Sequence, residues 1–256
     1  RAIQTLKEVD WIAAEDTRNT GLLLKHFDIS TKQISFHEHN AKEKIPDLIG
    51  FLKAGQSIAQ VSDAGLPSIS DPGHDLVKTA IEEDIAVVTV PGASAGISAL
   101  IASGLVPQPH IFYGFLPRKS GQQKQFFESK KDYPETQIFY ESPHRVADTL
   151  GNMLKVYGDR SVVLVRELTK IFEEYQRGKI TELLESISET PLKGECLLIV
   201  EGASLEVEDK DEEDLFAEIQ ARLQQGIKKN QAIKEVAKIY QWNKSQLYAA
   251  YHEWED

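Results

Sequence analysis

A short apolar run, a polar cluster and then an amphipathic stretch recur along the first hundred residues. Apolar runs at residues 11–15, 33–40, 57–63 and 86–92 each precede a stretch with helical periodicity. In residues 41–55, Ile45, Leu48, Ile49 and Leu52 recur at helical spacing, and Gly55 supplies a stop. Strands that alternate with helices predict a parallel sheet covered by helices.

A second set of strands and helices follows. Residues 137–141, 161–167 and 195–202 predict strands, and residues 180–188 predict a helix. In residues 142–158 we expect a helix that Ser142 caps and Pro143 begins. Its apolar face comprises Val146, Leu150, Met153, Leu154 and Tyr157.

A proline-rich stretch, residues 106–121, separates the two sets and is interpreted as an inter-domain crossing. The chain is therefore predicted to be α/β, with one α/β domain over residues 1–113 and another over residues 114–203. Its last part, residues 215–256, has a helical pattern throughout, with a helix-turn-helix rhythm.

Charge changes this picture at the C-terminal end. Residues 205–214 hold seven acidic residues and one Lys, whereas residues 215–252 hold six Lys or Arg and two Glu. We interpret residues 204–214 as a solvated acidic linker before a small basic unit. That unit is either a helical cap on the body or a nucleic-acid-binding element.

Composition excludes several classes of protein. The chain is 41% hydrophobic and 27% charged, and it has no apolar run near the ~18 residues of a membrane span. The single cysteine, Cys196, excludes a disulfide framework and fits a cytoplasmic protein. A net charge of -11 argues against indiscriminate nucleic-acid binding.

Polar clusters follow the predicted strands: residues 15–18 (EDTR), 62–65 (SDAG), 91–95 (PGASA), 141–145 (ESPHR) and 167–170 (ELTK). Ligands of open α/β sheets bind at this edge. In the loop at residues 61–73, Asp63 presents a carboxylate, Gly65 and Gly73 permit close backbone approach, and Pro67 and Pro72 stiffen the chain. No dinucleotide or phosphate-loop fingerprint is present. The pattern favours a polar small molecule.

Two other chemistries fit short motifs. The GASAG sequence at residues 92–96 matches the nucleophile elbow of serine hydrolases, with Ser94 as nucleophile, but none of the later histidines is well placed to be its partner. His37 and His39 lie on one face of a predicted strand, yet two imidazoles without a third ligand make a weak metal site. We predict no metal.

The motifs named above, with SFHEHN, GFLPRK, FYESPHR, RELTKIFEE and GECLLIVEG, resemble the tetrapyrrole methylase superfamily over residues 1–203. They are most similar to its branch that methylates small-subunit ribosomal RNA. The resemblance implies two α/β domains with S-adenosylmethionine in the cleft between them, and a homodimer. It also implies 2'-O-methylation of a cytidine in the decoding region of 16S ribosomal RNA, with that RNA or the small subunit as partner. A porphyrinoid methylase of the same fold is the alternative.

The resemblance also implies cofactor-binding residues. These are Asp63, Ala64, Gly65, Pro67, Ile69, Ser70, Ala93, Ser94, Ala95, Tyr140, Leu168 and Thr169. The family's first strand and its Pro-Ile-Gly-Asn-Leu loop do not occur in this sequence, which opens without Met in a helical pattern. We therefore expect a preceding segment to supply the opposite wall of the pocket.

Methylation of a ribose hydroxyl would benefit from a general base and from cations that steady phosphate or developing charge. The candidate bases are Asp16, His37, His39 and Glu141, and the candidate cations are Arg18, Arg145 and Lys170. Local basic residues are the candidates for RNA binding: Arg118, Lys119, Lys124, Lys228, Lys229 and Lys244.

Overall fold

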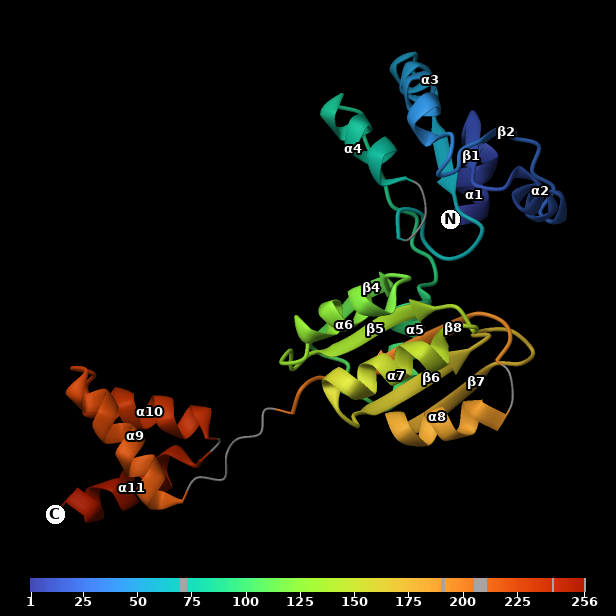
Figure 1. Ribbon diagram of the computed structural model, residues 1–256. Coiled ribbons are helices and arrows are strands. Elements are labelled where there is room, and N and C mark those ends of the chain that lie inside the picture. The colour runs from blue at the N-terminus through green and yellow to red at the C-terminus, as the bar shows by residue number, and fades with distance from the viewer. Residues whose placement is uncertain (70–72, 190–191, 205–210, 241, 256) are drawn as a thin grey trace. The chain divides into compact units, whose positions relative to one another are not determined.

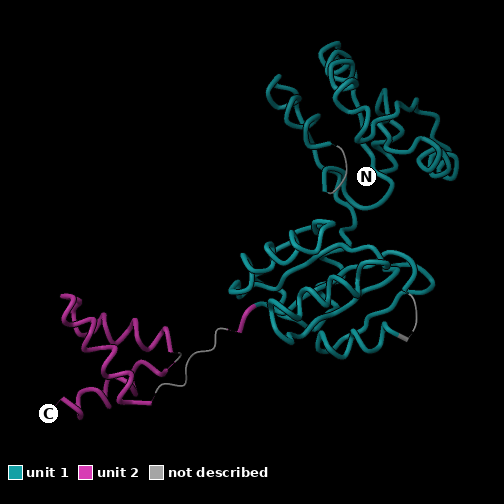
Figure 2. Tube along the Cα trace, viewed as in Figure 1, with its two compact units in different colours: residues 1–202 teal, residues 203–256 magenta. Residues whose placement is uncertain are grey.

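A computed structural model of the chain describes residues 1–69, 73–189, 192–204, 211–240 and 242–255 (Figure 1). It divides into two compact units, Arg1–Gly202 and Ala203–Asp256 (Figure 2). The first unit contains two separate sheets, one of three strands and one of five.

The first sheet has the order β2-β1-β3, and both of its strand pairs are parallel. Its strands are β1 (Trp11–Ala14), β2 (Lys32–Ser35) and β3 (Ile58–Val61). The neighbouring helices are α1 (Ala2–Glu8), α2 (Thr17–His26), α3 (Ala41–Lys53) and α4 (His74–Glu82). The parallel sheet predicted for this part of the chain is confirmed, and the carboxyl ends of its strands meet at one edge.

Successive residues of β1 bury on opposite faces of this sheet. Ala13 packs with Leu48 and Leu76 of α3 and α4, whereas Ile12 and Ala14 pack with Leu24 of α2. Ile12, Ala13 and Ala14 are each 0% exposed. Because side chains alternate along a strand, an apolar run without polar interruptions lets helices cover both faces.

The strand predicted over residues 86–92 is wrong. Residues 85–94 are assigned to neither helix nor strand, and Val87 and Val88 are 47% and 71% exposed. A valine-rich run has β propensity, but a strand also needs a neighbour with which to form backbone hydrogen bonds. None of the described strands pairs with this segment.

The second sheet has the order β4-β5-β8-β6-β7. Its strands are β4 (His110–Phe115), β5 (Thr136–Glu141), β6 (Ser161–Arg166), β7 (Glu174–Lys179) and β8 (Cys196–Val200). The pair β4-β5 is parallel and the remaining pairs are antiparallel. Strands β4 and β7 were not predicted. Strand β4 lies in the proline-rich stretch interpreted as a crossing, and the boundary predicted between residues 113 and 114 falls inside it.

Helices cover both faces of the second sheet (Figure 1). Phe139, Leu164 and Leu198 point towards α6 (Ser120–Glu128), α7 (Val146–Tyr157) and α8 (Ile180–Glu189). Their chain neighbours, such as Val163 and Ile199, pack with α5 (Ala95–Ser103) on the other face. The helix that follows PGASA thus covers the second sheet, although the sequence placed it in the first domain.

Arg177 of β7 holds the C-terminal end of α5. Its guanidinium donates hydrogen bonds to the carbonyl oxygens of Ala102 and Ser103, at 2.7 and 3.1 Å. These carbonyls lack helical partners, and a cation is favourable at this end of the helix dipole. The contact ties α5 to the second sheet across 74 residues of sequence.

The helix predicted from Ser142 begins later, at Val146, with Arg145 as its N-cap. Residues 143–145 form a turn closed by a hydrogen bond from the Arg145 N–H to the Ser142 carbonyl. The expected capping role of Ser142 and first position of Pro143 are therefore wrong. The expected apolar face is confirmed, with Val146, Leu150 and Met153 fully buried.

The second unit has three helices among its described residues: α9 (Glu212–Gln224), α10 (Lys229–Ile239) and α11 (Lys244–Glu255). They bury their own core, which includes Phe216, Ile233 and Tyr251. The predicted helical tail is confirmed. The predicted linker, 204–214, overlaps α9, which begins at Glu212. Asp211 caps that helix by accepting a hydrogen bond from the Asp214 N–H. Residues 205–210 lie outside the described residues.

Within the described residues, every helix is too short or too polar to cross a lipid bilayer.

Leu150→Ala tests the core of the second sheet. Leu150 is completely buried, so its truncation is expected to lower the free energy of unfolding by about 2–5 kcal/mol. Leu22→Ala is the control, because Leu22 is 72% exposed on α2 and should change stability by less than about 0.5 kcal/mol. Urea unfolding measures both; equal losses would contradict the described core.

Candidate functional site

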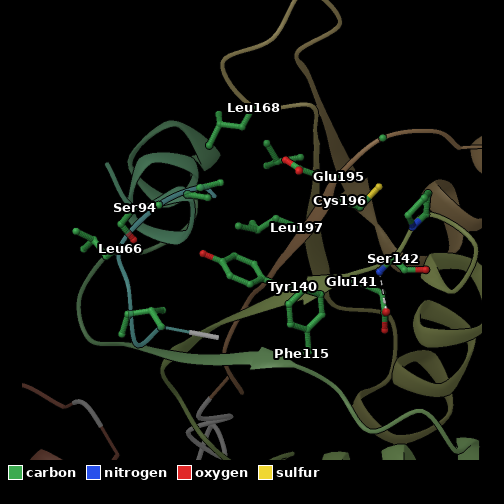
Figure 3. A pocket seen from close by; sticks show the side chains of 17 residues that line it. Leu66, Ser94, Phe115, Tyr140, Glu141, Ser142, Leu168, Glu195, Cys196 and Leu197 are labelled. Atoms are coloured by element: carbon green, nitrogen blue, oxygen red, sulfur yellow. Dashed lines mark hydrogen bonds between the residues drawn. The ribbon is translucent and has the colours of Figure 1, made fainter. Parts of the chain in front are cut away.

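A cavity of about 460 Å³ lies in the first unit, where loops that precede α4 and α5 meet strand ends of the second sheet (Figure 3). Five stretches of chain and one strand end line it: Ala64, Gly65, Leu66, Ile69; Ser94, Ala95; Phe115; Tyr140, Glu141, Ser142, Pro143; Val165, Leu168; and Gly194, Glu195, Cys196, Leu197. Its volume is within the ~300–1,000 Å³ usual for small-molecule sites.

The loop after β3 enters the left-handed backbone region beside the cavity. Gly65 has φ +74° and Ser68 has φ +71°. This conformation is natural for glycine and strained for serine, and such strain concentrates at functional sites. Leu66 of this loop packs so closely on Gly92 that a Cβ at position 92 would lie 3.3 Å from its Cδ2.

Aromatic and aliphatic side chains of the second sheet form the opposite wall. Tyr140 makes edge contacts with Phe115 and Phe112, with ring centroids 5.5 and 4.9 Å apart. Leu197 pairs with Tyr140 across the β5-β8 ladder, and both point into the cavity in Figure 3. Burial raises the pKa of the adjacent Cys196 thiol to about 11, so this thiol is protonated and unreactive near neutral pH.

A strained turn holds Leu168 at the cavity. Its neighbours Glu167 and Thr169 have φ +51° and +69°. The Glu167 carboxylate accepts hydrogen bonds from the Glu195 N–H and from Lys170, and these contacts lower its pKa. Gly194 has φ +85°, a conformation natural for glycine, and a side chain there would displace that carboxylate.

Glu141 is a buried carboxylate whose two oxygens both accept hydrogen bonds. Figure 3 draws the hydrogen bond with Ser142. Its Oε1 accepts from the Ser142 N–H at 2.8 Å and lies 3.3 Å from the Arg145 guanidinium, and its Oε2 accepts from the Thr149 hydroxyl at 2.8 Å. Its side chain is 0% exposed. These contacts suit a positioning residue better than a base.

Asp16 and Arg18 are also paired with each other. The Arg18 guanidinium donates to both carboxylate oxygens of Asp16, at 3.0 and 2.7 Å, while Asp16 caps α2. These hydrogen bonds lower the pKa of Asp16 to about 2, which makes it a weak base. Lys170 is similarly held, between Glu167 and Glu195.

The strand ends of the first sheet meet as their parallel register requires. Asn19 donates to the Asp63 carboxylate at 3.0 Å, and the Asp63 N–H donates to Glu15 at 3.1 Å. The EDTR and SDAG clusters are therefore joined. Asp63 itself is not among the residues that line the cavity.

His37 follows β2 and has a buried Nδ1 without a hydrogen-bond partner. Its ring lies 6.0 Å from that of His39. Across the described ranges, no group of three or more His, Cys, Asp or Glu is arranged to hold a metal ion.

Ser94 has the backbone of an ordinary helix cap, with φ -127° and ψ 117°. A nucleophile elbow needs a sharp, strained turn after a strand, whereas the described residues before Ser94 form no strand. The hydrolase interpretation therefore has no support in the local geometry.

The cavity includes seven residues that the family resemblance implied for cofactor binding: Ala64, Gly65, Ile69, Ser94, Ala95, Tyr140 and Leu168. Four others, Asp63, Pro67, Ala93 and Thr169, do not line it, and Ser70 lies outside the described residues, as does Pro72. Sequence reasoning missed Phe115, Val165, Cys196 and Leu197 because apolar strand residues carry no polar signal. Of the other missed residues, Ser142 and Pro143 lie within FYESPHR, and Gly194 and Glu195 lie within GECLLIVEG.

The residues predicted to bind RNA fall in two places. Arg118 and Lys124 line a second cleft of the first unit, and Lys119 lies beside them as the N-cap of α6. Lys228, Lys229 and Lys244 belong to the second unit, where Lys229 forms an ion pair with Glu255.

Comparison with known proteins agrees with this architecture. Residues 1–184 match the model of the family Tetrapyrrole (Corrin/Porphyrin) Methylases. Among solved structures, a cobalt precorrin-4 methyltransferase has a TM-score of 0.57 at 14% identity, covering 78% of this chain and 86% of that one. A uroporphyrin-III C-methyltransferase from Thermus thermophilus, complexed with S-adenosylhomocysteine, has a TM-score of 0.52 at 18% identity, covering 78% and 89%.

Curated relatives are far more similar in sequence. The protein named ribosomal RNA small subunit methyltransferase I from Streptococcus pyogenes serotype M1 is 71% identical to this chain. The match covers 99% of this chain and 89% of the relative. The protein of that name from Bacillus subtilis is 46% identical, over 98% and 88%. The chain belongs to the tetrapyrrole methylase family, in its ribosomal RNA small subunit methyltransferase I branch.

Proposed function

We propose that this protein transfers a methyl group from S-adenosylmethionine to the 2'-hydroxyl of a cytidine in the decoding region of 16S ribosomal RNA. The observation that carries the proposal is the 71% identity, over 99% of this chain, to a relative named for small-subunit ribosomal RNA. The porphyrinoid methylases share only 14–18% identity, which supports the fold alone.

The cavity suits S-adenosylmethionine in size and chemistry. It combines an aromatic and aliphatic wall at Phe115, Tyr140 and Leu197 with loop backbone at Gly65 and Ser94. Aromatic faces attract cations, and loop N–H and C=O groups can orient polar ends. A methylase of this fold solved with S-adenosylhomocysteine is consistent with this assignment.

The cofactor supplies an electrophilic methyl group, so the protein mainly has to align the ribose oxygen and exclude water. Tyr140, Leu168 and Leu197 provide the apolar surface that keeps water out. Glu141 fixes the turn at Ser142 through its hydrogen bond to that backbone N–H. In this proposal Glu141 positions the wall and does not accept the substrate proton.

His37 and His39 are the candidate bases without a charged partner among the described residues. Asp16 is held by Arg18, and both Glu141 oxygens accept hydrogen bonds. The His37 Nδ1 has no partner but is buried, so His37 would have to accept a proton through its other ring nitrogen, Nε2. We propose His37 as the group that receives the proton of the ribose hydroxyl. Arg18, Arg145 and Lys170, each paired with a carboxylate, would steady charge from fixed positions.

Two substitutions of Ser94 test the cofactor site. Ser94→Leu should lower the affinity for S-adenosylhomocysteine at least about tenfold, because the larger side chain fills part of the cavity. Ser94→Ala should keep the affinity and methyl transfer within about threefold, because Ser94 makes no capping hydrogen bond. Calorimetric titration measures both. Wild-type affinity in Ser94→Leu would place the cofactor elsewhere, and loss of transfer in Ser94→Ala would revive a catalytic serine.

His37→Ala should slow single-turnover methyl transfer to small ribosomal subunits by about 100-fold or more, since general-base catalysis contributes roughly 10²–10⁴. Cofactor affinity should not change. His39→Ala is the matched comparison and should retain most of the rate. Transfer by His37→Ala within about threefold of the unaltered protein would remove His37 as the base.

The helical unit is proposed to add RNA affinity through Lys228, Lys229 and Lys244. Because this unit has its own core, a chain that ends at Gly202 should keep the cores of the first unit. Its affinity for small ribosomal subunits should fall roughly tenfold at moderate salt, with unchanged affinity for S-adenosylhomocysteine. Filter binding and calorimetry measure the two. Unchanged RNA affinity would leave the unit as a structural appendage.

A further inference from the structure

A second cleft, of about 500 Å³, lies on the helical side of the second sheet between α6 and α7. Its lining residues come from the start of α6 and from the first three turns of α7: Arg118, Ser120, Gln123, Lys124, Arg145, Ala147, Asp148, Thr149, Gly151, Asn152 and Lys155. It is distinct from the cavity that contains Tyr140 and Leu197.

The cleft is strongly cationic. Four of its lining residues are Lys or Arg and one, Asp148, is acidic. Across the described parts of the chain, Arg118, Lys124 and Lys155 form no ion pair, so their charges are available to a ligand. In a protein with a net charge of -11, such a local excess favours an anionic partner at this place.

The floor of the cleft is polar and already ordered. Ser120 donates to Asn152 at 3.0 Å, Asn152 donates to Gln123 at 2.8 Å, and Gln123 donates to Thr149 at 3.2 Å. Thr149 in turn donates to Glu141. Gln123, Thr149 and Asn152 are at most 6% exposed. Buried polar groups are costly unless they are hydrogen-bonded, and a fully bonded network of this kind gives a rigid floor.

We propose that this cleft binds a backbone phosphate of the RNA substrate. Lys124, Lys155 and Arg118 would supply both the positive charge and the hydrogen-bond donors. The inference rests on the proposed function, because it assigns a contact of the same RNA substrate. It adds Lys155 to the basic residues that the sequence singled out.

Arg145 connects this cleft to the cofactor cavity. Its guanidinium pairs with Glu141, which lines the cavity, and donates to the carbonyl oxygens of Pro117 and Leu116 at 2.7 and 3.3 Å. The two sites therefore share a wall built from β5 and the start of α7. A phosphate seated in the cleft would be held at a fixed distance from the methyl donor.

The test is a double variant, Lys124→Gln with Lys155→Gln, compared with a control of equal charge change, Lys7→Gln with Lys25→Gln on α1 and α2. All four lysines lie on helices, and neither pair of substitutions breaks an ion pair of the described residues. With a single-stranded decoding-region oligoribonucleotide, the cleft variant should bind about tenfold more weakly. Its slope of log K against log salt should be shallower by about 0.7, since one phosphate contact on a single strand contributes ~0.7.

A second measurement does not depend on catalysis. Bound oligoribonucleotide should protect Lys124 and Lys155 from a lysine-acetylating reagent, read by mass spectrometry, and should leave Lys7 and Lys25 reactive. Equal RNA affinity in the two double variants, or equal acetylation with and without RNA, would overturn the cleft assignment. Failure of the wild-type protein to methylate ribosomal RNA, with protection intact, would overturn the proposed reaction and leave the cleft as an RNA site.

Discussion

The buried carboxylate of Glu141 links the two sites of the second sheet. A carboxylate with no exposed side-chain surface costs several kcal/mol unless its oxygens are partnered. Ser142, Thr149 and Arg145 provide those partners, and each of them also belongs to a ligand-facing surface. Ser142 lines the cofactor cavity, whereas Thr149 and Arg145 line the basic cleft. Loss of this charge would leave both surfaces without a common support.

Backbone strain and close packing give the cavity its shape. Ser68, Glu167 and Thr169 are non-glycine residues with positive φ, and each adjoins or flanks a stretch that lines the cavity. The surrounding contacts hold the turn at Leu168, notably the hydrogen bonds of Glu167 with Lys170 and with the Glu195 N–H. Strain of this kind persists where the neighbouring structure determines the conformation, and it keeps a pocket in shape before a ligand arrives.

Periodicity predicted the elements that obey a single local rule. The apolar stripe of α7 and the continuous apolar runs of β6 and β8 were found because their burial follows from spacing alone. Strand β4 was missed because prolines flank it, and β7 was missed because its EYQRGK sequence is polar. The valine run at residues 86–92 was taken for a strand, since pairing depends on residues far away in the sequence. In the same way, Asp63 and Tyr140 were found from motifs, whereas only the fold shows that Tyr140 lines the cavity and Asp63 does not.

The central claim concerns the chemical identity of the methylated group. The most direct measurement incubates the protein with tritiated S-adenosylmethionine and unmodified small ribosomal subunits, then digests the 16S RNA to nucleosides and separates them by chromatography with mass detection. We predict that the label co-migrates with 2'-O-methylcytidine and maps to one decoding-region fragment. Label on a nucleobase, or no label in 16S RNA, would contradict this account.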